Sequence, residues 1–235
     1  MTRNPIFCAL DTTDRDRAVT LARGLGGSVG GVKIGKEFFT AHGPEGVRAV
    51  AAGGMPVFLD LKYHDIPNTV AGAVRAACAL KPAIITVHAA GGRAMMKAAV
   101  DAATKAGGAS RPWVIAVTVL TSLDDADLAA VGYSGSAGDN VRRLAALAQA
   151  SGIDGVVCSA HEIASLRREC GANFKLVVPG IRPDGAALGD QKRTMTPAEA
   201  LALGADVLVI GRPITGAADP AQAARTIRDG LARAA

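Results

Sequence analysis

Three charged side chains follow one apolar run at a spacing that could support chemistry. Residues 57–59 (Val-Phe-Leu) read as a buried strand, and Asp60, Lys62 and Asp65 come directly after them. Side chains alternate along a strand, so Asp60 and Lys62 are expected to face the same side. An ammonium favours the ionised form of nearby carboxylates, whereas burial opposes it. With Lys33 these residues could form an alternating charged network. Ordinary salt bridges at a strand end are the alternative.

The same segment continues into a predicted helix. Pro67 disfavours a helical conformation at Ile66, and apolar residues recur at helical spacing from Val70 onward. We therefore expect Asn68 or Thr69 to cap a helix that begins just after the charged residues.

Two later segments indicate a phosphate site. Residues 178–183 (Val-Pro-Gly-Ile-Arg-Pro) and 210–213 (Ile-Gly-Arg-Pro) each follow an apolar run. Gly211 would let the backbone approach an anion, and the Arg212 guanidinium can bind phosphate oxygens in a fork. Glycine turns with surface arginines are the alternative. The stretch between them is long for a loop, so we expect a closing loop at about residues 180–195, or else a disordered one.

The elements that must position these residues form a repeating pattern. About eight apolar runs, each followed by a helical pattern, predict parallel βαβ units and a (β/α)8 TIM barrel. An open doubly wound sheet is the alternative, and no linker splits the single domain expected over residues 1–235. Polar residues at the strand ends would surround one mouth of such a barrel. The expected strands are residues 6–10, 31–34, 57–59, 83–88, 113–120, 155–158, 175–178 and 206–210.

Composition narrows the function class. The net charge is +5, yet there is no long basic run and aromatic residues make up only 3%, which disfavours a nucleic-acid groove. No stretch is apolar enough for a membrane span or signal segment, so a cytoplasmic protein is expected. The cysteines lack metal or disulfide spacing and read as reduced.

His64 and His88 could join Asp60 and Asp65 around a metal. No zinc spacing is present, so we expect no metal, although a magnesium site stays open.

The chain resembles the orotidine 5′-phosphate decarboxylase family in its bacterial form, over essentially its whole length. The resemblance rests on residues 9–11, 32–36, 60–69, 118–122, 179–182, 189–191 and 210–213. It implies a TIM barrel, a homodimer, no cofactor and no metal. It also implies conversion of orotidine 5′-monophosphate to uridine 5′-monophosphate and carbon dioxide.

The resemblance also implies roles for individual residues. Lys62 would be the catalytic ammonium, flanked by Asp60 and by Asp65 of the partner subunit, with Lys33 completing the network. Substrate contacts would come from Asp11, Lys33, Asp60, Ile66, Thr69 (across the interface), Thr121, Ser122, Pro179, Arg182, Gln191, Gly211 and Arg212. Of these, Asp11, Lys33 and Thr69 would lie by the ribose, Thr121 and Ser122 by the pyrimidine, and Gln191, Arg212 and Arg182 by the phosphate.

Two alternatives remain at this point. A magnesium-dependent keto-gulonate-phosphate-type decarboxylase would share the Asp-x-Lys-x-x-Asp core, although residues 64–69 argue against it. A non-catalytic nucleotide binder on the same scaffold would bind ligand without turnover.

Overall fold

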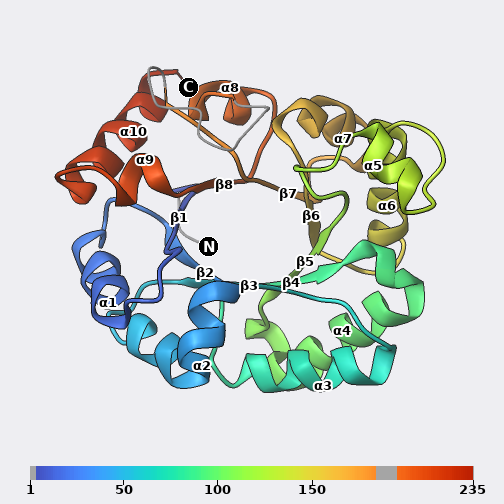
Figure 1. The fold of residues 1–235 in the computed structure, drawn as a ribbon, viewed down its shortest axis with the longest axis horizontal. Coiled ribbons are helices and arrows are strands. Elements are labelled where there is room, and N and C mark those ends of the chain that lie inside the picture. Colours follow the sequence, from blue (N-terminus) through green and yellow to red (C-terminus); the bar gives the residue numbers. More distant parts are fainter. Residues whose placement is uncertain (1–3, 184–194, 235) are drawn as a thin grey trace.

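Eight parallel strands close into a barrel in the computed structural model, which describes residues 4–183 and 195–234. Each strand pairs with its sequence neighbours, and β8 returns to pair with β1, so the sheet has no open edge. Figure 1 shows this ring of strands surrounded by helices. The predicted (β/α)8 barrel is confirmed and the open sheet is rejected. The strands are β1 Ile6–Ala9, β2 Gly31–Gly35, β3 Val57–Tyr63, β4 Ile84–His88, β5 Trp113–Val117, β6 Gly155–Val157, β7 Lys175–Val178 and β8 Val207–Ile210.

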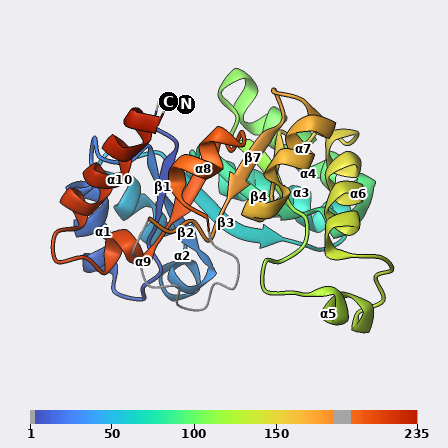
Figure 2. The same cartoon turned by 90° about the horizontal axis from the view of Figure 1, so that it is seen from above.

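The helices fill the outer layer of the barrel. The α-helices are α1 Arg15–Gly24, α2 Lys36–Ala51, α3 Pro67–Cys78, α4 Gly92–Gly107, α5 Asp125–Ala130, α6 Ala137–Gln149, α7 Ile163–Cys170, α8 Pro197–Ala202, α9 Arg212–Thr215 and α10 Pro220–Ala234. Short 3-10 turns add η1 Ala89–Gly91, η2 Gly108–Ser110 and η3 Ala160–Glu162. Figure 2 shows α5 projecting away from the body of the barrel. Within the described ranges, no helix has the length and apolar character needed to cross a membrane.

β3 runs to Tyr63, so Asp60 and Lys62 lie within the strand and Asp65 follows it, as expected from strand alternation. Two local expectations were wrong: the cap of the next helix and the end of the fifth strand. The helix α3 begins at Pro67, and its N-cap residue is Ile66, which makes no side-chain capping bond. Proline at the first helical position has no N–H to satisfy and a preset φ, so the helix begins there and Asn68 and Thr69 lie inside its first turn. The fifth strand also ends three residues early, at Val117.

The barrel interior is a small apolar cluster that is separate from the larger core under the helices. Phe7 and Phe58 pack edge to face there with ring centroids 6.2 Å apart, together with Ile84, Ile115 and Val177. Gly31 makes room for the Phe7 ring, because a Cβ at that position would lie 2.3 Å from it. We call this cluster the apolar floor, because the next inward-facing side chains along the strands lie directly above it.

Every second side chain of a strand faces the barrel interior, so the inward-facing residues after the apolar cluster lie at the mouth of the barrel. Phe58 faces inward, so Asp60, two residues on, faces inward as well, while Leu59 and Leu61 pack in the outer core. Phe7 and Ala9 lead to Asp11 in the same way. The strand register therefore places the polar residues directly above an apolar floor.

At the opposite end of the strands, a carboxylate joins neighbouring elements. Asp206 accepts hydrogen bonds from Arg167 Nη2 (2.6 Å), from Lys175 Nζ (3.1 Å) and from the Leu176 N–H (2.9 Å). These contacts join α7, the start of β7 and the start of β8. Loss of the charge would leave the Arg167 and Lys175 cations without the anion that they share.

We predict that Asp206→Asn lowers the free energy of unfolding by about 2 kcal/mol, because the two partly buried cations lose their anion. Urea unfolding followed by circular dichroism measures the change. Glu45→Gln is the matched control, since Glu45 pairs with Arg48 on the exposed surface of α2 and such pairs contribute little. Equal losses in the two variants would contradict this assignment.

Candidate active site

A cavity of about 290 Å³ opens at the carboxyl ends of the strands. Nine of the residues singled out from the sequence line it, and they come from both halves of the chain. Barrel enzymes build their sites at this end. These nine are Asp11, Lys33, Asp60, Lys62, Thr121, Pro179, Arg182, Gly211 and Arg212.

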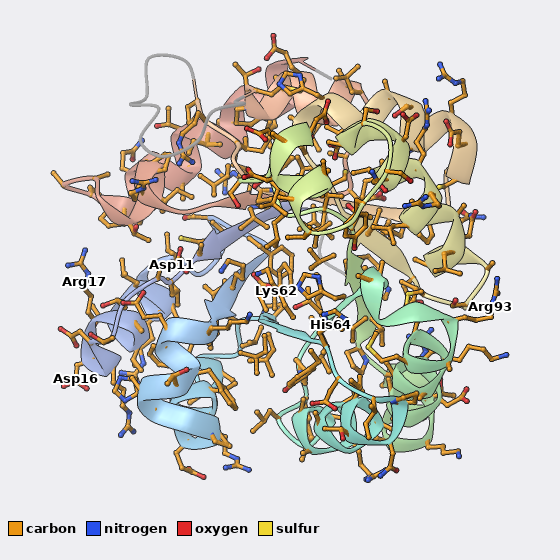
Figure 3. The ribbon with its side chains drawn as sticks, turned by 45° about the vertical axis from the view of Figure 1, so that its right-hand side comes forward. Asp11, Asp16, Arg17, Lys62, His64 and Arg93 are labelled. Atoms are coloured by element: carbon orange, nitrogen blue, oxygen red, sulfur yellow. The ribbon has the colours of Figure 1, made fainter. Side chains whose placement is uncertain are left out.

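Asp60 lies at the centre of a charged network on the β1–β3 side of the cavity. Its Oδ2 atom is 2.7 Å from Lys62 Nζ and 3.6 Å from Lys33 Nζ. Lys33 Nζ also lies 3.3 Å from Asp11 Oδ1. Figure 3 shows Lys62 between Asp11 on one side and His64 on the other. The loop after β1 and the strands β2 and β3 thus supply two ammoniums and two carboxylates in alternation.

The network keeps Asp60 ionised although the carboxyl is buried. The Asp60 side chain is only 10% exposed. Burial alone would raise its pKa, but the charges of Lys33 and Lys62 and hydrogen bonds from Lys62 and Thr86 together lower it below the ordinary value. A negative charge is therefore fixed beside the Lys62 ammonium.

The backbone at Lys62 is unusual. Its φ is +53°, a left-handed conformation that non-glycine residues seldom adopt. The residue lies at an irregularity of β3, where the pairing with β4 shifts between Leu59 and Tyr63. Such irregularities are common beside active sites because they redirect a side chain.

Thr86 is a residue that the sequence did not single out. Its hydroxyl lies 2.9 Å from Asp60 Oδ1 and 2.9 Å from the Lys62 backbone nitrogen. The sequence offered no signal for it, because a β-branched residue inside an apolar strand is ordinary.

Two arginines face the cavity from the β7–β8 side. Arg182 is buried, and burial together with the nearby charge of Arg212 lowers its pKa. Because like charges are brought together there, that end of the cavity is suited to an anion. The loop that carries Arg182 is fixed at its base, where the Arg182 N–H donates to the Met195 carbonyl (3.0 Å).

The wall between the charged network and the arginines is largely apolar. It consists of Val117, Val119, Leu120, Val157, Val177 and Val209. A flat, weakly polar group could occupy this part of the cavity, with an anion at one end and a reacting centre at the other.

Several predicted residues lie outside this cavity. Asp65, Ile66 and Thr69 are exposed, and the Asp65 carboxylate accepts a hydrogen bond from the Ile66 N–H (2.7 Å). Ser122 lines a neighbouring hollow beside α5. Gln191 and most of the expected closing loop lie outside the described residues. One chain therefore brings Asp60, Lys62 and Lys33 together without Asp65.

The two histidines near the site pack against each other. The rings of His64 and His88 are 5.3 Å apart. Burial, His64 and the nearby lysines lower the pKa of His88 to about 4, so its ring is neutral at pH 7. Among the residues that the structure describes, no three His, Cys, Asp or Glu side chains gather as a metal site would require. The metal-free site stays a prediction.

Comparison with known proteins gives consistent matches over nearly the whole chain. The model of the orotidine 5′-phosphate decarboxylase / HUMPS family matches residues 4–227. A protein of Rhodospirillum rubrum named orotidine 5′-phosphate decarboxylase is 60% identical over 231 residues, covering 97% of this chain and 94% of that protein. One of the same name from Paramagnetospirillum magneticum is 58% identical, covering 96% of this chain and 97% of that protein.

The solved structures agree with these relatives. The crystal structure of orotidine 5′-phosphate decarboxylase from Lactobacillus acidophilus superimposes with a TM-score of 0.86 at 36% identity. The match covers 97% of this chain and 99% of that one.

We predict that Asp60→Asn destabilises the protein at pH 7 and that this difference shrinks in acid. The pKa of Asp60 is lowered by folding, so its ionisation stabilises the fold fully above the unfolded-state pKa, about 4. The stabilisation is lost as the pH falls through the lower folded-state pKa. The urea unfolding midpoints of the wild type and of Asp60→Asn, compared between pH 7 and pH 3, measure this difference in stability. A difference that stays constant down to pH 3 would refute the assignment.

Proposed function

The chain belongs to the orotidine 5′-phosphate decarboxylase / HUMPS family, and we propose that Lys62 carries its chemistry, the decarboxylation of orotidine 5′-monophosphate to uridine 5′-monophosphate in pyrimidine biosynthesis. The observation that carries this proposal is the Lys62 ammonium, 2.7 Å from a buried and ionised Asp60 at the cavity mouth. The names of relatives more than 50% identical to this chain support the substrate.

The chemistry asks for a fixed positive charge. When the carbon–carbon bond breaks, carbon dioxide leaves and the electron pair stays on C6 of the pyrimidine as a localised carbanion. An ammonium already in place stabilises that charge as it develops and then donates a proton to the same carbon. Lys62 becomes neutral in this step and takes a new proton from solvent. No cofactor is required in this scheme.

Asp60 and Lys33 support the ammonium in different ways. Asp60 holds Lys62 by a short ion pair, so little reorganisation is needed when the carbanion forms. Lys33 bridges Asp60 and Asp11, which ties the network to β1 and places Asp11 beside the cavity. We assign Asp11 and Lys33 to the ribose and Thr121 to the pyrimidine.

The arginine end of the cavity is assigned to the phosphate. Arg182 and Arg212 converge there, with Gly211 and Pro179 beside them. Contacts far from the reacting carbon can supply binding energy that orders the site for the transition state. Gln191 and the closing loop at about residues 180–195 belong to the same proposal.

We further propose that the protein is a homodimer whose subunits complete each other's sites. Residues 64–69 form an unbroken exposed run at the end of β3, and the Ile66 side chain is 66% exposed. A partner covering this run would bury an apolar side chain and bring Asp65 and Thr69 to the other subunit's cavity. Ile66 would join the substrate contacts in the same way. The cytoplasmic location stays a prediction.

Turnover of orotidine 5′-monophosphate by the purified protein tests the function. We expect loss of the ultraviolet absorbance of the substrate, an equal yield of uridine 5′-monophosphate, and no effect of a chelator. Folded protein that binds the nucleotide without turnover would instead indicate a binder. Magnesium-dependent turnover of keto-gulonate phosphate would indicate the related decarboxylase.

The phosphate assignment predicts a substrate-dependent effect of Arg212→Ala. Loss of a charge-assisted hydrogen bond should lower kcat/KM for orotidine 5′-monophosphate about 100-fold. The activity on orotidine, which lacks the phosphate, should change little. Arg48→Ala, on the exposed surface of α2, is the control. Equal losses on both substrates would remove Arg212 from the phosphate end.

The shared site predicts complementation between two inactive variants. Lys62→Ala and Asp65→Ala should each be inactive as homodimers. In a mixed dimer, one site keeps both residues, so an equal mixture should recover about a quarter of the wild-type activity. Mass spectrometry of the intact dimers confirms subunit exchange. Exchange without recovery would show that Asp65 does not act across an interface.

A further inference from the structure

Thr86 lies below the charged network and outside the lining of the cavity. It is the middle residue of β4, and its side chain is fully buried. Its neighbours Ile84 and Val87 pack in the two apolar cores. A hydroxyl in such surroundings must find hydrogen-bond partners, because an unpaired one is costly to bury.

The pairing of β3 with β4 shows why a hydroxyl is needed at this position. The ladder runs regularly through Leu59 opposite Ile85, and resumes at Tyr63 opposite Val87. Residues 60–62 therefore stand opposite Thr86 alone. Lys62 lies in this bulge with φ +53°, and its backbone N–H donates to Thr86 Oγ1 (2.9 Å). The Thr86 side chain thus holds the bulged backbone where regular pairing is interrupted.

The same hydroxyl also orients the carboxylate. Thr86 Oγ1 donates to Asp60 Oδ1 (2.9 Å), whereas both lysines approach the other oxygen, Oδ2. With one oxygen held by a fully buried group, the carboxylate plane cannot rotate freely. The single Thr86 hydroxyl therefore uses its proton for Asp60 and a lone pair for the Lys62 backbone.

We propose that Thr86 is a positioning residue of the active site, which fixes the Asp60 carboxylate and the left-handed Lys62 backbone relative to each other. It acts through these two residues and does not touch the substrate. The inference rests on the proposed decarboxylase function, because the position of the Lys62 ammonium matters for that chemistry. A small displacement of a reacting group can cost a large part of the rate.

The test compares variants that differ only in the hydroxyl. Thr86→Val keeps the shape and removes the hydrogen bonds, and we expect kcat for orotidine 5′-monophosphate to fall about 10- to 100-fold with little change in KM. Thr86→Ser should restore most of kcat. Thr118→Val is the matched control. Among the described residues, the buried Thr118 hydroxyl donates to the Val157 carbonyl alone (2.9 Å), on the next strand and away from the charges.

The pH profile separates positioning from general destabilisation. The Thr86 hydrogen bond helps to lower the pKa of Asp60, so its removal should move the acid limb of kcat/KM to higher pH. The other groups that face Asp60 are Lys33, Lys62 and His88, and they are unchanged in every variant. The substrate phosphate is likewise common to all variants. Thr118→Val should leave the acid limb in place.

The activities of the Thr86 variants either support or overturn the positioning role. Should Thr86→Val fail to fold, Thr86→Ala takes its place, with the same expected loss and limb shift relative to Thr86→Ser. A Thr86→Ser variant as impaired as Thr86→Val, or a hydroxyl-free variant equal to Thr118→Val, would overturn the proposal. If wild type and Thr118→Val are folded yet inactive, the proposed function fails instead.

Discussion

The ion pair between Asp60 and Lys62, which are brought together inside a closed barrel, is the interaction on which the rest of the site depends. A carboxylate that is 10% exposed stays charged because two ammoniums share it and Thr86 donates a hydrogen bond to it. Together with Asp11, the network of two cations and two anions carries no net charge. Removal of any one member would leave an uncompensated charge at a partly buried position, which costs more than the pair itself contributes.

The barrel makes this network possible because three different strands must end at the same level. Asp11 follows β1, Lys33 belongs to β2, and Asp60 belongs to β3. The register of these strands is fixed below the network by Phe7 and Phe58, whose contact requires a glycine at position 31. The apolar floor also keeps water away from beneath the charges, so their interactions are stronger than at an open surface. The apolar packing inside the barrel therefore both positions the charges at the mouth and strengthens the interactions between them.

Much of this could be predicted from the sequence, and the exceptions share a cause. Continuous apolar runs and helical spacing were enough for the eight strands and favoured a barrel, although they left an open sheet as the alternative. The pair Asp60 and Lys62 followed from strand alternation. The bulge in β3, the left-handed Lys62 and the part played by Thr86 did not, because they depend on which residues of β4 lie opposite. That register is set by packing between strands distant in sequence, and a single sequence does not record it. Asp65 was grouped with Asp60 by nearness along the chain, yet α3 begins just beyond it and leaves it exposed.

Exposure and ion pairing distinguish the two lysines of the network. Lys33 is 11% exposed and lies between two carboxylates, Asp11 and Asp60, so its N–H donors are largely committed to balancing charge. Lys62 is 26% exposed, and within the described part of the chain its only ion pair is with Asp60. An ammonium has three donors. Lys62 is therefore the member of the network with donors left to face the cavity, and it is held on one side by a fixed anion and on the backbone side by Thr86. A group that must both stabilise an approaching negative charge and release a proton to it needs this combination of constraint and access.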